Sequence, residues 1–235
     1  EAADATTSSQ ISFATTNGTT VPHIGGQAAR YLSVPSLTGA TNGINLTFSN
    51  SGPNGGGNYI NDYTLIMDIY SPGAAGWQAL FNTDVANTND ADFYINTTGQ
   101  LGIGELGYGA SPVVSQNQWT RIAFVADLDG GIVKYFVNGT LAHTRTGAPM
   151  TDGRFALYSN ANAGADLLLF NEGISGVYTH DLYVNSVAFT DATLSDSAIA
   201  ALGGPSAAGI FVPEPGSSLL AVLSCAGLLA RRRRA

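Results

Sequence analysis

Short apolar stretches recur along the whole chain, and nearly every one is bounded by Gly, Asn, Pro or Asp. Stretches of this length fit β-strands, and Gly and Asn supply the positive φ angles that tight turns require. The pattern predicts an all-β fold, a sandwich of two packed antiparallel sheets. The expected strands cover residues 30–34, 44–48, 63–70, 77–81, 92–95, 119–127, 132–137, 141–144, 154–158, 167–170 and 182–189.

Two local sequence patterns predict a hairpin turn and a central strand within this sandwich. Asn138-Gly139 separates two strand-like runs and predicts a type I′ hairpin, whereas residues 119–127 are apolar on both faces and predict a central strand. One segment, 195–202, indicates a short helix near the C-terminal side, with Ser195 as N-cap and Gly203 placed to end it.

The composition excludes several function classes. Of the 235 residues 44% are hydrophobic and 11% charged, and residues 1–211 carry a net charge of −11. A surface of that sign repels phosphate backbones, so no nucleic-acid partner is expected. Cys225 is the single cysteine, which excludes an internal disulfide and a thiol-ligated zinc site.

The last 24 residues have three parts. Val212-Pro213-Glu214-Pro215 comes first, an apolar run over 219–230 follows, and Arg231, Arg232, Arg233 and Arg234 close the chain before Ala235. The apolar part predicts a hydrophobic tail helix that is short for a ~30 Å hydrocarbon core. The arginines would remain on the cytoplasmic side and leave the body outside, so membrane contact is expected only through this tail.

This three-part order resembles the PEP-CTERM sorting signal of Gram-negative bacteria, whose Pro-Glu-Pro motif an exosortase-type membrane peptidase recognises. The resemblance implies a secreted protein of the cell envelope or extracellular matrix. It also implies transient membrane retention and cleavage near Val212–Pro215, so that an exosortase is an expected partner.

The body resembles a second family. Residues 63–70, the 119–127 strand and Val137-Asn138-Gly139 are similar to the laminin-G-like, concanavalin A-like jelly roll. The expected organisation is an N-terminal extended segment or outer strand over 1–26, the jelly roll over 27–205, a linker over 206–211 and the sorting tail over 212–235. This fold hosts lectins, adhesion modules and glycosidases, so the resemblance leaves function open.

No catalytic residues are predicted. A retaining glycosidase needs two carboxylates about 5 Å apart, and the four glutamates of this chain are far apart in sequence. Asp90 and Asp92 have the spacing to share one strand face, but they stand at a loop-to-strand junction.

An acidic loop over residues 82–92 predicts a calcium site. It gathers three carboxylates and three amides without a base, and calcium prefers such oxygen ligands. The alternative is a solvated Asn/Asp-rich turn. The predicted ligands are Asp84, Asn89, Asp90, Asp92 and, following the 167–170 strand, Glu172.

Aromatic residues near loops are candidates for the rim of a ligand site. Tyr59, Tyr108 and Tyr178 have this position, whereas Trp77 and Trp119 fall within expected strands and are expected to pack in the core.

These features favour a non-catalytic module that binds extracellular polysaccharide or a surface protein, with calcium as a stabilising ion. Two alternatives remain: a structural subunit that self-associates into a sheath or fibre, and a glycoside hydrolase of the jelly-roll class. Residues 1–26 are polar and Thr-rich, and they suit either a flexible stalk or a strand donated to a neighbour.

Overall fold

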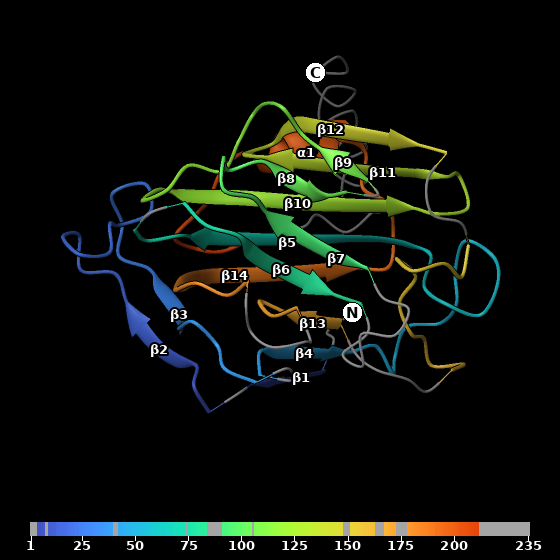
Figure 1. Cartoon of the computed structure of the whole chain (residues 1–235), viewed down its shortest axis with the longest axis horizontal. Helices are drawn as coiled ribbons and strands as arrows, with labels where there is room; N and C mark the ends of the chain where they lie inside the picture. The colour runs from blue at the N-terminus through green and yellow to red at the C-terminus, as the bar shows by residue number, and fades with distance from the viewer. Residues whose placement is uncertain are drawn as a thin grey trace, which may run out of the picture.

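The protein is a two-sheet antiparallel β-sandwich, as the sequence predicts. The computed structural model describes residues 4–7, 9–39, 42–73, 75–83, 91–104, 106–147, 151–162, 167–172 and 178–211. Within them, two seven-stranded sheets lie face to face, and one short helix covers part of one sheet (Figure 1). We call the sheet nearer the viewer in Figure 1 the front sheet and the other the back sheet.

The front sheet joins strands from distant parts of the chain. Its order across the sheet is β1 (Asp4–Thr7), β4 (Ile44–Thr47), β13 (Leu167–Leu169), β6 (Gln78–Asn82), β7 (Asp92–Ile95), β8 (Leu101–Ile103) and β9 (Gly107–Tyr108).

The back sheet contains the longest strands. Its order is β12 (Thr140–Thr146), β11 (Ile132–Val137), β10 (Trp119–Asp127), β5 (Asp62–Tyr70), β14 (Leu182–Thr190), β3 (Arg30–Val34) and β2 (Ser12–Thr15). The predicted central strand, β10, pairs with β5 and β11 on its two sides. The predicted hairpin turn is confirmed by positive φ values of 50° at Asn138 and 78° at Gly139.

The core lies between the two sheets. Along β10, Ile122, Phe124 and Ala126 face the front sheet, because successive strand residues alternate between faces. Phe124 has its ring centroid 4.9 Å from those of Phe81 and Phe93 on the front sheet. These aromatic contacts hold the two layers together.

The helix α1 (Asp196–Leu202) covers the outer face of the back sheet. Ile199 packs there against Ile66, Ala123 and Phe136. The predicted cap is confirmed, since the Ser195 side chain accepts a hydrogen bond from the Ala198 backbone N–H.

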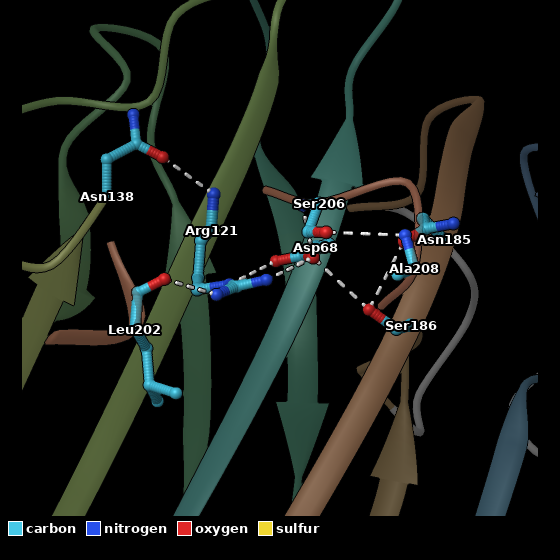
Figure 2. Close-up of polar contacts among 8 residues, drawn as sticks. All are labelled: Asp68, Arg121, Asn138, Asn185, Ser186, Leu202, Ser206 and Ala208. Atoms are coloured by element: carbon cyan, nitrogen blue, oxygen red, sulfur yellow. Dashed lines mark hydrogen bonds and ion pairs between the residues drawn. The ribbon is translucent and has the colours of Figure 1, made fainter. Parts of the chain in front are cut away.

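A buried ion pair lies next to this helix. Arg121 of β10 donates two hydrogen bonds of 2.7 Å to Asp68 of β5, and its Nη1 donates to the Leu202 carbonyl at the end of α1 (Figure 2). The Ser206 backbone N–H and the Ser186 hydroxyl also donate to Asp68. Residues 206–211, which we expected to be a linker, therefore contact the back sheet, and Ile210 packs against the apolar patch beneath α1.

Three features differ from the expectations. The strand expected over 154–158 is wrong, because residues 151–155 form turns and only Leu157 exchanges backbone hydrogen bonds with Ile60. The short strands β8 and β9 were not predicted. Within residues 1–26 the structure has β1 in the front sheet and β2 in the back sheet.

The predicted sorting motif Val212–Pro215 and the arginines 231–234 lie outside the described residues, as does the expected tail helix. Among the described residues, no helix has the length and hydrophobicity needed to cross a membrane.

Candidate functional site

Four aromatic side chains gather on the outer face of the front sheet. The Trp77 ring centroid lies 6.1 Å from Tyr94, 6.1 Å from Tyr108 and 6.0 Å from Tyr178, and Tyr94 and Tyr178 are 5.7 Å apart. We call these four residues the Trp77 cluster. They come from four separate stretches of sequence, and the three tyrosines surround the indole ring of Trp77.

Strand alternation places the Trp77 cluster on the outer face. Phe93 and Ile95 point into the core, so Tyr94 between them points outward. Tyr94 pairs in register with Ala79 of β6, and Trp77 is two residues before Ala79, on the same side.

The expected burial of Trp77 is wrong. Trp77 is 37% exposed and Tyr178 is 40% exposed. The reason is a β-bulge in β6: Leu80 and Phe81 both belong to the core, and the register shifts between Ala79 and Phe81, so Trp77 shares the outer face with Ala79. An exposed tryptophan among tyrosines offers apolar area together with hydroxyl groups.

A glycine lies between two rings of the cluster. Gly102 pairs in register with Tyr94 on one side and Tyr108 on the other. A Cβ on Gly102 would lie 2.2 Å from the Gly107 carbonyl oxygen, and its φ of 151° is unfavourable for other residues. Glycine therefore allows β9 to approach β8 and bring Tyr108 to the cluster.

Polar groups flank the aromatic rings. The exposed His180 ring lies against the backbone of Gly76, the neighbour of Trp77, and the His180 backbone N–H donates to the Gln78 side-chain oxygen at 2.8 Å. The Tyr108 hydroxyl is protonated at neutral pH and can donate a hydrogen bond, and partial burial raises its pKa further above its usual value. The cluster thus combines an apolar floor with donors and acceptors at its edge.

The three tyrosines predicted from loop position separate into two places. Tyr108 and Tyr178 are members of the Trp77 cluster, whereas Tyr59 contacts Tyr158 at 5.3 Å in a different region. Trp77 and Tyr94 were not among the predicted rim residues. The alternating pattern of 92–95, polar or aromatic outward and apolar inward, contained the signal for Tyr94.

Two of the predicted calcium ligands, Asp92 and Glu172, contact the same residue, Asn82. The Asn82 side chain donates to the Asp92 carboxylate at 3.1 Å and to the Glu172 backbone carbonyl at 2.6 Å. Asp92 and Glu172 therefore lie at the same end of the front sheet. Asp84, Asn89 and Asp90 lie outside the described residues, and the calcium site stays a prediction.

Among the described residues, a different group of carboxylates has the spacing to hold a cation. Oxygen atoms of Asp62, Asp127 and Asp129 lie within 4.8 Å of one another at the far end of the back sheet. Burial, reinforced by the charges of Asp129 and Asp127, raises the pKa of Asp62 to about 6. When ionised, these three carboxylates repel one another.

The geometry defines a β-sandwich with an exposed aromatic surface on one sheet. No protein-family model matches the chain, and no curated protein is similar to it in sequence.

Solved structures share the fold. Domain 4 of AbnA, an extracellular arabinanase from Geobacillus stearothermophilus, solved with arabinotriose, is 16% identical with a TM-score of 0.51, over 81% of this chain and 87% of that one. The binding domain of Paraclostridial Mosquitocidal Protein 1 is 11% identical with a TM-score of 0.55, over 85% and 47%. The binding domain of botulinum neurotoxin serotype D is 11% identical with a TM-score of 0.51, over 85% and 45%. This chain thus spans less than half of each toxin structure.

Proposed function

We propose that this protein is a non-catalytic carbohydrate-binding module and that the Trp77 cluster binds the saccharide. The observation that carries the proposal is a partly exposed tryptophan ringed by three tyrosines on an outer sheet face. Aromatic side chains on a protein surface expose apolar area to water. Such exposed apolar surfaces are typical of ligand sites.

The chemistry of the cluster suits a sugar ring. The C–H face of a pyranose or furanose is apolar and packs on an indole, while its hydroxyls need hydrogen-bond partners at the edge. Tyr108, Tyr178 and His180 supply such partners. The chain has a formal net charge of −8, which repels acidic polysaccharides, so the proposed ligand is a neutral glycan.

The three similar folds support a binding role. The arabinanase domain was solved in complex with arabinotriose, and the toxin structures are described as binding domains. We extend the proposal to a secreted module of a Gram-negative cell envelope, stabilised by calcium at the 82–92 loop and sorted by an exosortase through Val212–Pro215. Support for these parts comes from the sequence patterns alone.

Binding is tested with full-length protein by isothermal titration against neutral oligosaccharides, namely arabinotriose, xylotriose, cellotriose and laminaritriose. Trp77→Ala should weaken binding at least about tenfold, since a central aromatic residue often contributes more than 1.4 kcal/mol. Tyr178→Ala should weaken it less. Phe13→Ala is the matched control, because Phe13 is also an exposed aromatic, at 73%, but lies on β2 of the back sheet.

Equal affinity of Trp77→Ala and wild type for a bound sugar would remove the Trp77 cluster from the proposal. Release of reducing sugar from arabinan, xylan or laminarin above background would instead show a glycoside hydrolase.

One observation favours the self-associating alternative. Strand β2 is at the edge of the back sheet, pairs with β3 on its inner side, and exposes Phe13. Edge strands with exposed apolar residues pair readily with other chains. Sedimentation velocity over a range of concentrations tests this: a structural subunit should assemble, and Phe13→Lys should return it to monomer.

A further inference from the structure

A second aromatic cluster lies on the outer face of the back sheet. Trp119, Tyr70 and Tyr183 are neighbours in register on β10, β5 and β14, and Tyr31 of β3 completes the group. The Tyr70 centroid is 5.5 Å from Trp119 and 5.7 Å from Tyr183, and Tyr31 is 4.9 Å from Tyr183. We call these four residues the Trp119 cluster.

Alternation fixes its direction. Ile69, Ile122, Leu182 and Val184 belong to the core between the sheets, so the residues next to them in each strand, Tyr70, Arg121 and Tyr183, point outward. Trp119 is two residues before Arg121 and shares its face. Both tryptophans of the chain therefore stand on outer faces, one on each sheet. Trp119 contacts Tyr31 and Tyr70, which are 9% and 5% exposed, and Tyr183 contacts both of these tyrosines.

A cavity opens beside Trp119. Its volume is about 300 Å³, and it is lined in part by Pro22, His23, Asn117, Gln118, Trp119 and Pro205. The Trp119 Nε1–H donates to the Pro22 carbonyl at 2.8 Å, which fixes the indole at the wall of the cavity. Small-ligand pockets begin at about this volume and combine aromatic walls with a few polar groups.

The polar groups of this cavity are suited to hydroxyls. Gln118 is an exposed amide, the Asn117 amide exchanges two hydrogen bonds with the Gly73 backbone, and His23 is held by a 2.9 Å hydrogen bond between its Nδ1 and the Thr16 hydroxyl. Amides accept and donate, as sugar hydroxyls do. The lining has no carboxylate and no permanently charged base, which fits a neutral ligand.

The two clusters lie at one end of the sandwich. Tyr178 contacts Trp77 on the front sheet, and five residues later Tyr183 contacts Tyr70 and Tyr31 on the back sheet. Between them, the His180 N–H is bound to Gln78 at the start of β6. This short segment connects the clusters around the end of the sandwich, where β10 and β14 begin (Figure 1).

We propose that the Trp119 cluster and its cavity form a second carbohydrate site, so that one domain binds two neutral saccharide chains on opposite faces and cross-links them. This inference rests on the proposed function of the Trp77 cluster. Two sites on one rigid domain raise the avidity for long chains beyond the affinity of either site.

The experiment uses the fact that the chain has two tryptophans, one in each cluster. Trp119→Phe leaves Trp77 as the sole tryptophan emitter, and Trp77→Phe leaves Trp119. Each full-length variant is titrated with arabinotriose, xylotriose, cellotriose and laminaritriose, and its fluorescence reports the site that retains tryptophan. Thermal melting of each variant shows that it is folded.

The proposal expects a saturable fluorescence change in both variants and two sugars bound per wild-type chain by titration calorimetry. Gln118→Ala should weaken the Trp119 response several-fold and leave the Trp77 response unchanged. A long polysaccharide of the same sugar should become turbid with wild type and stay clear with Trp119→Phe combined with Gln118→Ala.

The outcomes separate the two proposals. A response from Trp77 alone, with one sugar per chain, overturns the second site and keeps the proposed function. A response from Trp119 alone overturns the assignment of the Trp77 cluster. No response from either variant, with no heat of binding in wild type, overturns both.

Discussion

Arg121 and Asp68 form a bidentate ion pair that is almost entirely inaccessible to water, with side chains 6% and 0% exposed. The pair joins β10 to β5, and through the Leu202 carbonyl and the Ser206 N–H it also fixes the chain that leaves α1 (Figure 2). The ion pair thus adds polar contacts to the packing of Ile199 and Ile210, which also attach the C-terminal part of the described chain to the back sheet.

Replacing Arg121 with Met should destabilise the protein by about 3–5 kcal/mol, because Asp68 would remain as a buried carboxylate without its cation. Urea unfolding measures the loss. Hydrogen exchange should show faster exchange in α1 and residues 203–211, since the Leu202 carbonyl also loses its donor.

Two controls accompany this variant. Lys134→Ala removes the exposed pair with Asp196 and should cost no more than about 1 kcal/mol. The double variant Asp68→Leu, Arg121→Met removes both charges and should be more stable than Arg121→Met alone. A double variant as unstable as the single one would mean that packing, and not the unpaired charge, dominates.

The close approach of β9 to β8 predicts that a methyl group added at Gly102 destabilises the protein. Gly102→Ala should destabilise the protein by about 1–3 kcal/mol, because the new Cβ meets the Gly107 carbonyl and the backbone is strained. It should also weaken saccharide binding, since β9 carries Tyr108.

Gly104→Ala is the matched control. A Cβ on Gly104 meets no atom within 4 Å, so this variant should melt and bind like wild type. Equal stability of the two variants in chemical unfolding would show that β9 adapts to the added methyl group.

The sequence predicted the strands where its pattern repeats every second residue. Residues 92–95, 119–127 and 132–137 form strands with the expected bounds, since their apolar side chains, alternating in 92–95 and on both faces in 119–127, are bounded by turn residues. Residues 154–158 have a similar composition, but Asp152 accepts N–H bonds from Asn58 and Tyr59 and holds this part of the chain in turns. Such a long-range contact is not visible in local sequence.

The candidate site was less predictable for a related reason. Trp77 and Tyr178 are about a hundred residues apart in sequence, and their contact depends on how the segment before β14 passes β6. Their position near loops selected Tyr108 and Tyr178, which belong to the Trp77 cluster. It also selected Tyr59, which contacts Tyr158 in a different region. The outward direction of Trp77 depends on the β-bulge between Ala79 and Phe81, because strict alternation over the expected strand 77–81 would place Trp77 on the inward side with Phe81.

The predicted calcium site gives a direct test by thermal melting. Metal-stripped protein should melt at a higher temperature with millimolar calcium and return to its original value with chelator, because binding to the folded state alone stabilises it by about 2.7 kcal/mol at a hundredfold excess over Kd. Asp90→Asn should reduce the shift. Asp129→Asn is the control at the other acidic group, and loss of the shift in Asp129→Asn alone would place the ion there instead.

The acidic group at the far end of the back sheet predicts how stability depends on pH. Asp62 and Asp127 are directly opposed in the register of β5 and β10, and Asp129 follows in the turn. Burial and these two charges raise the pKa of Asp62 to about 6, above its ordinary value near 3.9 in an unfolded chain. Between these two values the folded state binds more protons than the unfolded state.

The stabilising contribution of Asp62 is therefore present at low pH. It decreases as the pH rises from about 4 to about 6, and it remains low at pH values above about 6. Asp62→Asn, which cannot ionise, should gain stability over wild type at pH 7.5 but not at pH 4, as measured by urea unfolding. Asp152→Asn should show the opposite sign. Desolvation raises the pKa of Asp152, but hydrogen bonds from Asn58, Asn61 and Tyr59 outweigh it and lower the pKa. This variant should therefore lose stability at pH 7.5. An identical difference between Asp62→Asn and wild type at both pH values would show that repulsion among the three carboxylates is screened or neutralised in the folded protein.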